Sequence, residues 1–470
     1  MKPLTITRRT RLVRLDVCFL LATGVLAMAA TSNAESRLDG KTLLQQHSPL
    51  PARTPETSDP LSHHESPDER SLRLRMAPSE RRSSPAQTWI RDAYLSIQVN
   101  VDDSGNNILN DAANEPSIAV DPTDPARIAI GWRQFDTIAS NFRQAGVGYS
   151  ADHGDTWTFP GVLDPGTFRS DPVLGYDAEG NFYYNSLAWP EGSGPWCDIF
   201  KSTDGGASWD GGTYAYGGDK QWMAIDRTGG IGHGNIYMNW TLGYSSCNGN
   251  FTRSYDNGAT FEPCTTLPGS PFHGTCAVGP DGELYICGAG FTVLKSTTLQ
   301  DETLPYQFDL TTTVSLDGSK TGYAGPNPGG LLGQVEIDVD CSEGSYRGNV
   351  YLLCSVERYS TADPLDVMFA RSTNGGETWS DPVRINDDPA DNGAWQWFGA
   401  MSVSPDDGRI DVTWNDTRND PGGYDSELYY AYSDDGGATW SPNVALSPSF
   451  DPYLGWPQQN KLGDYNDMIS

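Results

Sequence analysis

The stretch Ser433-Asp434-Asp435-Gly436-Gly437-Ala438-Thr439-Trp440 is repeated along the chain with small changes. Further copies begin at Ser150, Ser202, Ser254 and Ser372, and a degenerate copy begins at Ser296. Neighbouring copies are 42–76 residues apart, which is typical of a repeat architecture. Each copy separates two alternating apolar runs, so it predicts a hairpin turn. In such a turn the Asp binds backbone N–H groups, a Gly adopts a positive φ, and the Trp packs between strands.

The sequence between the copies has the pattern of β-propeller blades. In the first unit, the apolar runs 116–120 and 127–132 flank a turn at 121–125, and the other units repeat this order. Four short strands in each of six units predict an all-β propeller, and no long helical period competes with it. Two further segments, 94–101 and 463–470, predict an incomplete seventh blade. A closed ring of six blades is the alternative.

The repeated stretch resembles the Asp-box (BNR) repeat of the sialidase superfamily of β-propellers. The resemblance covers residues 115–470, roughly, and implies a propeller of four-stranded blades. In that superfamily the boxes lie on the face opposite the active site. The repeat therefore predicts how the chain is built, and the function has to be sought on the other face.

The N-terminal residues predict export. Arg8, Arg9, Arg11 and Arg14 precede the apolar run 17–30 and the small-residue site Ser32-Asn33-Ala34, so we expect a signal peptide at 1–34. Residues 35–88 are rich in Pro, Ser and Arg and predict a disordered linker before the propeller at 89–470. No later run has the length of a membrane-spanning helix, so we expect a secreted or periplasmic protein without membrane insertion.

The predicted propeller is strongly acidic. The whole chain has a formal net charge of −30, and residues 93–470 hold 17 Lys and Arg against 51 Asp and Glu. This charge opposes binding to nucleic acid or to anionic membranes. Solubility is the plain explanation for it, and binding of a cation or a cationic substrate is the alternative. The sequence does not indicate an oligomeric state.

Seven cysteines follow the predicted signal peptide, in a compartment where disulfides persist. Cys276 and Cys287 flank one turn, Cys341 and Cys354 flank another, and either pair is placed to bridge a hairpin. Cys264 competes for Cys276, and Cys197 and Cys247 occupy similar places in neighbouring repeats. The connectivity stays open, and no spacing suggests a zinc site.

In a four-stranded blade, the start of the first strand and the end of the second lie at one rim, away from the boxes. Trp, Arg and amide side chains with paired carboxylates at this rim suit a saccharide, although polar residues also gather there because the rim is wet. The candidate residues at the rim are Arg133, Arg169, Asp171, Gln221, Trp222, His273, Glu336, Glu357, Arg358, Trp397, Asp416, Arg418 and Tyr465.

The resemblance implies roles for part of this set. Sialidases hold the substrate carboxylate with three Arg, use an Asp as acid and base, and attack with a Tyr activated by a Glu. By position, Arg133, Arg358 and Arg418 would bind the carboxylate, and Tyr465 with Glu336 or Glu357 would form the nucleophilic pair. Asp171 or Asp416 would be the acid. The remaining candidates (Arg169, Gln221, Trp222, His273 and Trp397) would bind substrate. The sequence departs from the family because no Phe-Arg-Ile-Pro motif precedes its first box.

These observations favour a glycoside hydrolase that acts on acidic or decorated saccharides. A non-catalytic propeller that binds a glycan or a protein is one alternative. A polysaccharide lyase is the other, with His273 near a Tyr as the base that removes a proton beside a uronate carboxylate. None of these reactions requires a cofactor. The oxygen-rich loop 102–111 is a candidate for structural calcium, although a plain Asx-rich turn is the favoured explanation.

Overall fold

The computed structural model describes residues 83–91, 94–135, 137–190, 192–321, 325–420, 422–457 and 459–470. The predicted signal peptide and residues 35–82 of the predicted linker lie outside the described residues. Within the described ranges, no helix is long and apolar enough to cross a membrane.

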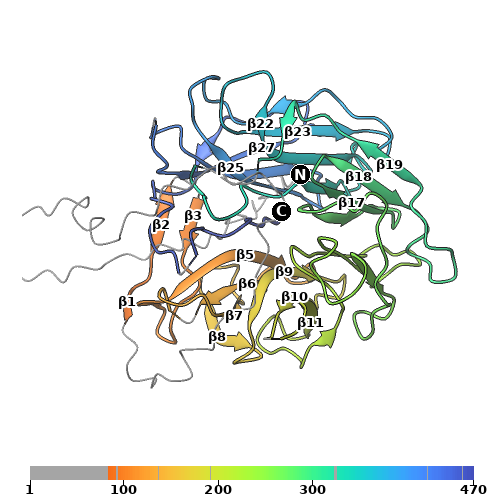
Figure 1. Cartoon of the computed structure of the whole chain (residues 1–470), viewed down its shortest axis with the longest axis horizontal. Coiled ribbons are helices and arrows are strands. Elements are labelled where there is room, and N and C mark those ends of the chain that lie inside the picture. The colour runs from red at the N-terminus through yellow and green to blue at the C-terminus, as the bar shows by residue number, and fades with distance from the viewer. Residues whose placement is uncertain are drawn as a thin grey trace, which may run out of the picture.

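The described chain forms six antiparallel sheets arranged around a common centre (Figure 1). Each sheet is one blade, and its strands follow the chain order from the inside outward. The strands of blades one to three are β5 (Ala112–Val120), β6 (Ile128–Phe135), β7 (Arg143–Ser150) and β8 (Thr158–Leu163); β9 (Arg169–Tyr176), β10 (Phe182–Ala188), β11 (Trp196–Ser202) and β12 (Thr213–Tyr214); and β13 (Trp222–Ile225), β14 (Ile236–Asn239) and β15 (Phe251–Ser254).

Blades four to six have the same order. Their strands are β16 (Cys276–Val278), β17 (Leu284–Gly288), β18 (Thr292–Ser296) and β19 (Leu310–Thr313); β21 (Glu336–Val339), β22 (Val350–Arg358), β23 (Asp366–Ser372) and β24 (Val383–Arg384), with β20 (Gly318–Ser319) also paired to β22; and β25 (Gln396–Val403), β26 (Ile410–Asp416), β27 (Glu427–Ser433) and β28 (Val444–Ala445). In blade three a single bridge between Phe251 and Thr265 stands in for the fourth strand. The prediction of an all-β propeller is confirmed.

The Asp-box turns join the third strand of a blade to the fourth. In the last box, Asp435 accepts hydrogen bonds from the Thr439 amide (2.8 Å) and hydroxyl (2.6 Å). The Ser433 hydroxyl donates to Asp435 (2.9 Å) and accepts from the Gly437 amide (2.9 Å). In the boxes that end in Trp157, Trp209 and Trp379, the indole N–H also donates to the carbonyl of the box glycine. The turn thus satisfies its own backbone, as the repeated sequence predicted.

Where two neighbouring blades meet, a large side chain of one blade packs against a glycine of the other. Tyr184 of β10 is fully buried and donates to the carbonyl of Gly146 on β7 (3.2 Å). A Cβ on Gly131 of β6 would lie 2.5 Å from both Leu174 and Tyr184. The missing side chain therefore lets blade two approach blade one, and the apolar core continues from one blade to the next.

The ring has six blades, so the predicted incomplete seventh blade is wrong. β3 (Tyr94–Ile97), within the segment 94–101, pairs with β2 (Thr88–Arg91) and packs on blade six, where Tyr94 contacts Tyr430. Beside it, β1 (Ser83–Pro85) pairs with β4 (Asn106–Ile108). Residues 463–470 form no strand, and the C-terminal residue lies near the centre of the ring (Figure 1).

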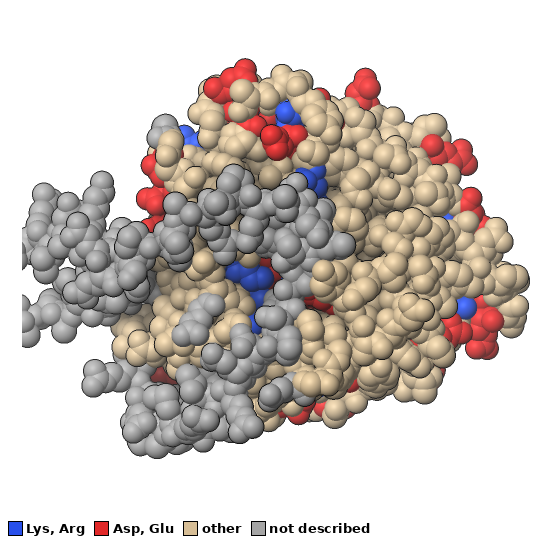
Figure 2. Space-filling model, in the orientation of Figure 1, with Lys and Arg blue, Asp and Glu red and all other residues tan. Residues whose placement is uncertain are grey.

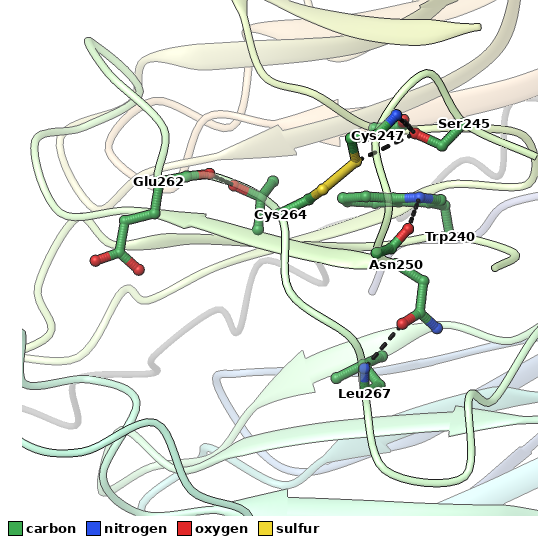
Figure 3. Close-up of a disulfide and its surroundings, with 10 residues drawn as sticks. Trp240, Ser245, Cys247, Asn250, Glu262, Cys264 and Leu267 are labelled. Carbon is green, nitrogen blue, oxygen red and sulfur yellow. Dashed lines mark hydrogen bonds between the residues drawn. A yellow bond between two sulfur atoms is a disulfide. The ribbon is translucent and has the colours of Figure 1, made fainter. Parts of the chain in front are cut away.

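One disulfide is present among the described residues. It joins Cys247 to Cys264 at the outer part of blade three, beside the ring of Trp240 (Figure 3). Neither candidate hairpin pair is bonded, since the other cysteines of the propeller are free: Cys197, Cys276, Cys287, Cys341 and Cys354. In the first candidate pair, Cys276 stands opposite Ile286, not Cys287, in the strand register. Cys287 instead directs its thiol to the Val335 carbonyl (3.1 Å).

The surface is acidic, as the composition predicted. Figure 2 shows Asp and Glu side chains spread around the edge of the face seen in Figure 1. In the loop that was a calcium candidate, Asp102 accepts hydrogen bonds from the amides of Ser104 (2.9 Å) and Asn106 (2.9 Å), which is an Asx turn. Within the described residues, no group of three His, Cys, Asp or Glu side chains is placed to hold a metal ion.

Candidate functional site

In each blade, one residue in the inner strand or just before it occupies an equivalent place at the rim opposite the Asp boxes. Each lies six positions before the residue that begins the first turn of its blade. We call these residues the mouth ring: Glu115, Asp171, Lys220, His273, Gln334 and Phe398. All six are buried, and all except Gln334 have a positive φ, between 47° and 59°. This backbone conformation is unfavourable for residues other than glycine and recurs at functional and structural constraints.

A segment of the same chain fills the space inside the mouth ring. Residues 459–470 follow blade six and enter the centre of the propeller, where Gly463 packs on Glu115. Further along, Asp467 accepts hydrogen bonds from the Ser117 hydroxyl (2.6 Å) and the Ile118 amide (3.2 Å) of β5. The Ser470 amide donates to Ser402 of β25 (3.0 Å). This channel segment therefore joins the inner strands of blades one and six.

Lys220 holds the channel segment by charge. Its ammonium lies 2.5 Å from Asp464, 3.4 Å from Asp171 and 3.7 Å from Asp219, and all four side chains are fully buried. Lys461 adds a second ammonium 2.6 Å from Asp464. Burial alone would raise the pKa of Asp464, but Lys220 and Lys461 hold it well below its ordinary value. The centre is thus a compensated ionic network.

Two predicted catalytic residues meet in this network, and the structure shows both in structural contacts. The Tyr465 hydroxyl donates to the Pro172 carbonyl (3.0 Å), and its ring packs against Trp222 with centroids 5.5 Å apart. Burial raises the pKa of Tyr465 well above its ordinary value, which opposes the formation of a phenolate nucleophile. Asp171 binds the Lys220 amide (3.2 Å) as well as its ammonium. Gln221 donates to the Asp171 carbonyl.

The three arginines that the resemblance implied each contact a different set of carboxylates. Arg133 lies in the centre, where its Nε is 3.0 Å from Glu115. Arg358 contacts Asp317 (3.0 Å) and Asp366 (3.2 Å) on blade five. Arg418 contacts Asp416 (2.8 Å) and Asp387 (2.6 Å). Each guanidinium is therefore already paired with carboxylates close to it.

The remaining predicted carboxylates do not form a pair with Tyr465. Glu336 is buried in the channel, and burial raises its pKa well above the ordinary value, with Asp467 adding to the shift. Glu357 accepts a hydrogen bond from the Thr321 hydroxyl (3.0 Å) at the surface. Asp416 is buried and binds the Trp414 indole (2.8 Å) in addition to Arg418.

Two further candidates have roles inside their own blades. Arg169 bridges Asp164 (2.8 Å) and Asp198 (2.7 Å) and lies over the Phe200 ring. Trp397 is fully buried, and its indole donates to Ser426 (3.1 Å). Both side chains complete the packing of a blade.

The open site at this rim lies to one side of the axis, between blades four and five. It is a cavity of about 820 Å³. We call it the rim cavity, and its lining includes His273, Phe272, Phe291, Lys320 and Tyr359. Hydroxyl groups of Thr313, Ser315 and Ser319 are also on its wall, and none of its described lining residues is an Asp or a Glu. Its size and mixed lining are those of a small-molecule site.

Lys320 gives the rim cavity a positive charge. Among the described residues, no carboxylate forms an ion pair with it, and desolvation lowers its pKa. Tyr359 stands at the entrance, 78% exposed. An ammonium without an ion-pair partner among the described residues favours an anionic ligand.

Sequence reasoning missed Lys220, Lys320 and Tyr359. Lys220 had a usable signal, because it stands at the same place in its unit as Glu115 and Asp171 do in theirs. Lys320 and Tyr359 had none. They come from two segments that β20 and β22 bring together, and that pairing is not encoded in the repeat.

The repeats and the closed ring define a six-bladed β-propeller built on Asp-box turns. The profile of the BNR/Asp-box repeat family matches residues 431–442, which span the last of the repeated turns. No curated protein matches the sequence significantly.

Three solved structures are similar at low identity. The first is a protein of unknown function from Dyadobacter fermentans (15% identity, 78% of this chain and 87% of that chain, TM-score 0.41). The second is a Hadza microbial sialidase (12%, 76% and 63%, 0.38). The third is the Aleuria aurantia lectin in complex with α-methyl-L-fucoside (12%, 74% and 98%, 0.39).

Proposed function

We propose that this propeller is an exported glycan-binding protein that holds an acidic saccharide in the rim cavity. The observation that carries the proposal is the unneutralised ammonium of Lys320 in a cavity lined by aromatic rings and hydroxyl groups. A sugar carboxylate would pair with Lys320, and Phe272, Phe291 and Tyr359 would contact its apolar faces. The Cys247–Cys264 disulfide and the predicted signal peptide support export.

Binding is favoured over hydrolysis by the positions of the carboxylates. Hydrolysis by a pair of Asp or Glu needs two such groups beside the bound sugar, and the described lining of the rim cavity contains neither residue type. The carboxylates of the mouth ring are covered by the channel segment. Hydrolysis at the axis would therefore require residues 459–470 to leave the mouth.

A second candidate is a lyase, favoured because His273 and Tyr359 line the same cavity as Lys320. Lys320 would neutralise the uronate carboxylate, His273 would accept the adjacent proton, and Tyr359 would protonate the leaving oxygen.

The test is binding of uronate oligosaccharides to the full-length protein, followed by incubation and measurement of unsaturated products. We expect Lys320→Met to weaken binding about tenfold, equivalent to about 1.4 kcal/mol. The matched control is Lys201→Met, which removes a partly exposed ammonium of blade two. Unsaturated products that disappear with His273→Phe would establish the lyase. Uronate binding that Lys320→Met leaves unchanged would refute the assignment to this cavity.

A further inference from the structure

Four aromatic side chains form a continuous row beside blade six. The ring centroids of Trp395 and Tyr424 are 6.2 Å apart, those of Tyr424 and Tyr453 are 5.6 Å apart, and those of Tyr453 and Trp456 are 4.8 Å apart. Tyr424 is 38% exposed and the other three are half-buried. We call this group the aromatic row. None of its members lines the rim cavity.

Three separate segments bring the row together and hold it. Trp395 directly precedes β25, Tyr424 lies in the loop between β26 and β27, and Tyr453 and Trp456 follow β28. The Tyr453 hydroxyl donates to the Gly325 carbonyl, and the Trp395 ring packs on the same glycine. The Trp456 indole nitrogen is buried and has no hydrogen-bond partner among the described residues. The aromatic row is therefore held in place before any ligand binds, and the Trp456 indole N–H is a donor without a partner among the described residues.

Three carboxylates lie along the aromatic row. Asp420 accepts a hydrogen bond from the Asp425 amide (3.0 Å), and Asp451 accepts one from the Tyr453 amide (2.8 Å). Desolvation, Asp451 and Asp420 together raise the pKa of Asp425. Within the described ranges, no Lys or Arg forms an ion pair with any of the three. This part of the rim therefore concentrates negative charge without a protein cation to balance it.

Unbalanced carboxylates beside aromatic faces attract an organic cation, because an ammonium group gains both ion pairing and cation–π contact. A metal ion does not fit, since no group of three ligating side chains is placed to hold one within the described residues. The row is also longer than one ammonium group covers. We propose that the aromatic row and its carboxylates bind an amino-sugar oligosaccharide, with its sugar rings on the aromatic faces and its ammonium groups on Asp420, Asp425 and Asp451. The choice of a sugar over a peptide rests on the proposed function.

The experiment is isothermal titration of the full-length protein with a glucosamine oligomer, an N-acetylglucosamine oligomer of equal length, and oligolysine. We expect the glucosamine oligomer to bind at least about tenfold more tightly than the acetylated one, with affinity that falls as salt rises. Asp425→Asn and Tyr424→Ala should each weaken it severalfold. Asp281→Asn, which removes an exposed carboxylate from a turn on the opposite face, should not.

Several results would overturn the proposal. Equal affinity for the acetylated oligomer would remove the role of the ammonium group. If oligolysine binds as tightly as the glucosamine oligomer, and Tyr424→Ala weakens both equally, the site binds cations and is not specific for sugars. Loss of glucosamine binding in Lys320→Met, without loss in Asp425→Asn, would move the ligand into the rim cavity. Uronate binding in the rim cavity is read out separately, so failure of one site is distinguishable from failure of the other.

Discussion

Replacing Lys220 by Met tests whether the channel segment is held by charge. Lys220 contacts Asp171, Asp219 and Asp464 together, at 3.4, 3.7 and 2.5 Å. All four side chains are fully buried, so water cannot replace the ammonium. Met fills a similar volume and removes only the charge and its hydrogen bonds.

The expected loss is about 3–5 kcal/mol, the usual cost of removing one partner from a buried ion pair. The sign of the pH dependence follows from Asp464, whose pKa is held well below its ordinary value in the folded protein. Its contribution is present above the unfolded pKa of about 4 and is lost as pH falls toward the folded value. The difference between wild type and Lys220→Met should therefore shrink below about pH 4.

Urea unfolding gives the stability difference, and hydrogen exchange shows where it arises. We expect the amides of residues 461–468 to lose protection first in Lys220→Met. The matched control is Lys201→Met, because Lys201 is 27% exposed and 3.9 Å from Asp177, so its loss should cost less than about 1 kcal/mol. The double variant Lys220→Met/Asp464→Asn should recover part of the stability. A loss below about 1 kcal/mol in Lys220→Met, with unchanged exchange of 461–468, would refute the role of charge.

Three further predictions follow from single contacts. Asp435→Ala should lower the free energy of unfolding by about 1–2 kcal/mol in thermal or chemical unfolding, because four hydrogen bonds end on this carboxylate. Asp435→Asn should lower it less, since Asn374 occupies the equivalent position in another box. Cys247→Ser and Cys264→Ser should each cost about 3 kcal/mol, as the bond closes a loop of 17 residues, and reducing agent should have no additional effect on either variant. Burial raises the pKa of Asp467 to about 6, so stability should fall as pH rises from 4 to above 6, and Asp467→Asn should flatten that slope in unfolding measured against pH.

The repeated local sequence predicted the blade, but it could not predict contacts between segments that are distant in the sequence. Ser150 and its equivalents fix turns through bonds to residues two and four positions away, so the pattern is visible in the sequence. The rule that joined strand starts to one rim also placed Asp171 and His273 correctly on the same side of the ring. It could not show that residues 459–470 return to the centre, because that path depends on Lys220, which lies 244 residues away from Asp464.

The site was predicted less well for the same reason. The carboxylates and arginines selected for chemistry are mostly used for structure, as with Asp416, which holds Trp414 and Arg418. Their residue types suit both purposes, and only burial and partners distinguish them. Lys320 is the opposite case, a candidate that the sequence did not indicate. A single Lys in a loop belongs to no sequence pattern, and it becomes a candidate only because it lines the cavity.

The channel segment has a consequence for how the protein is made. Asp467 binds β5 across 350 residues of sequence, so the contact that closes the ring is available only after blade six has been synthesised. Until then Ser117 and Ile118 on the inner strand of blade one lack this partner, and an exposed strand edge favours aggregation in a growing chain. Contacts of such long sequence separation also slow folding. Ring closure is thus the expected rate-limiting step of biogenesis, and early blades would benefit from a chaperone until the segment arrives.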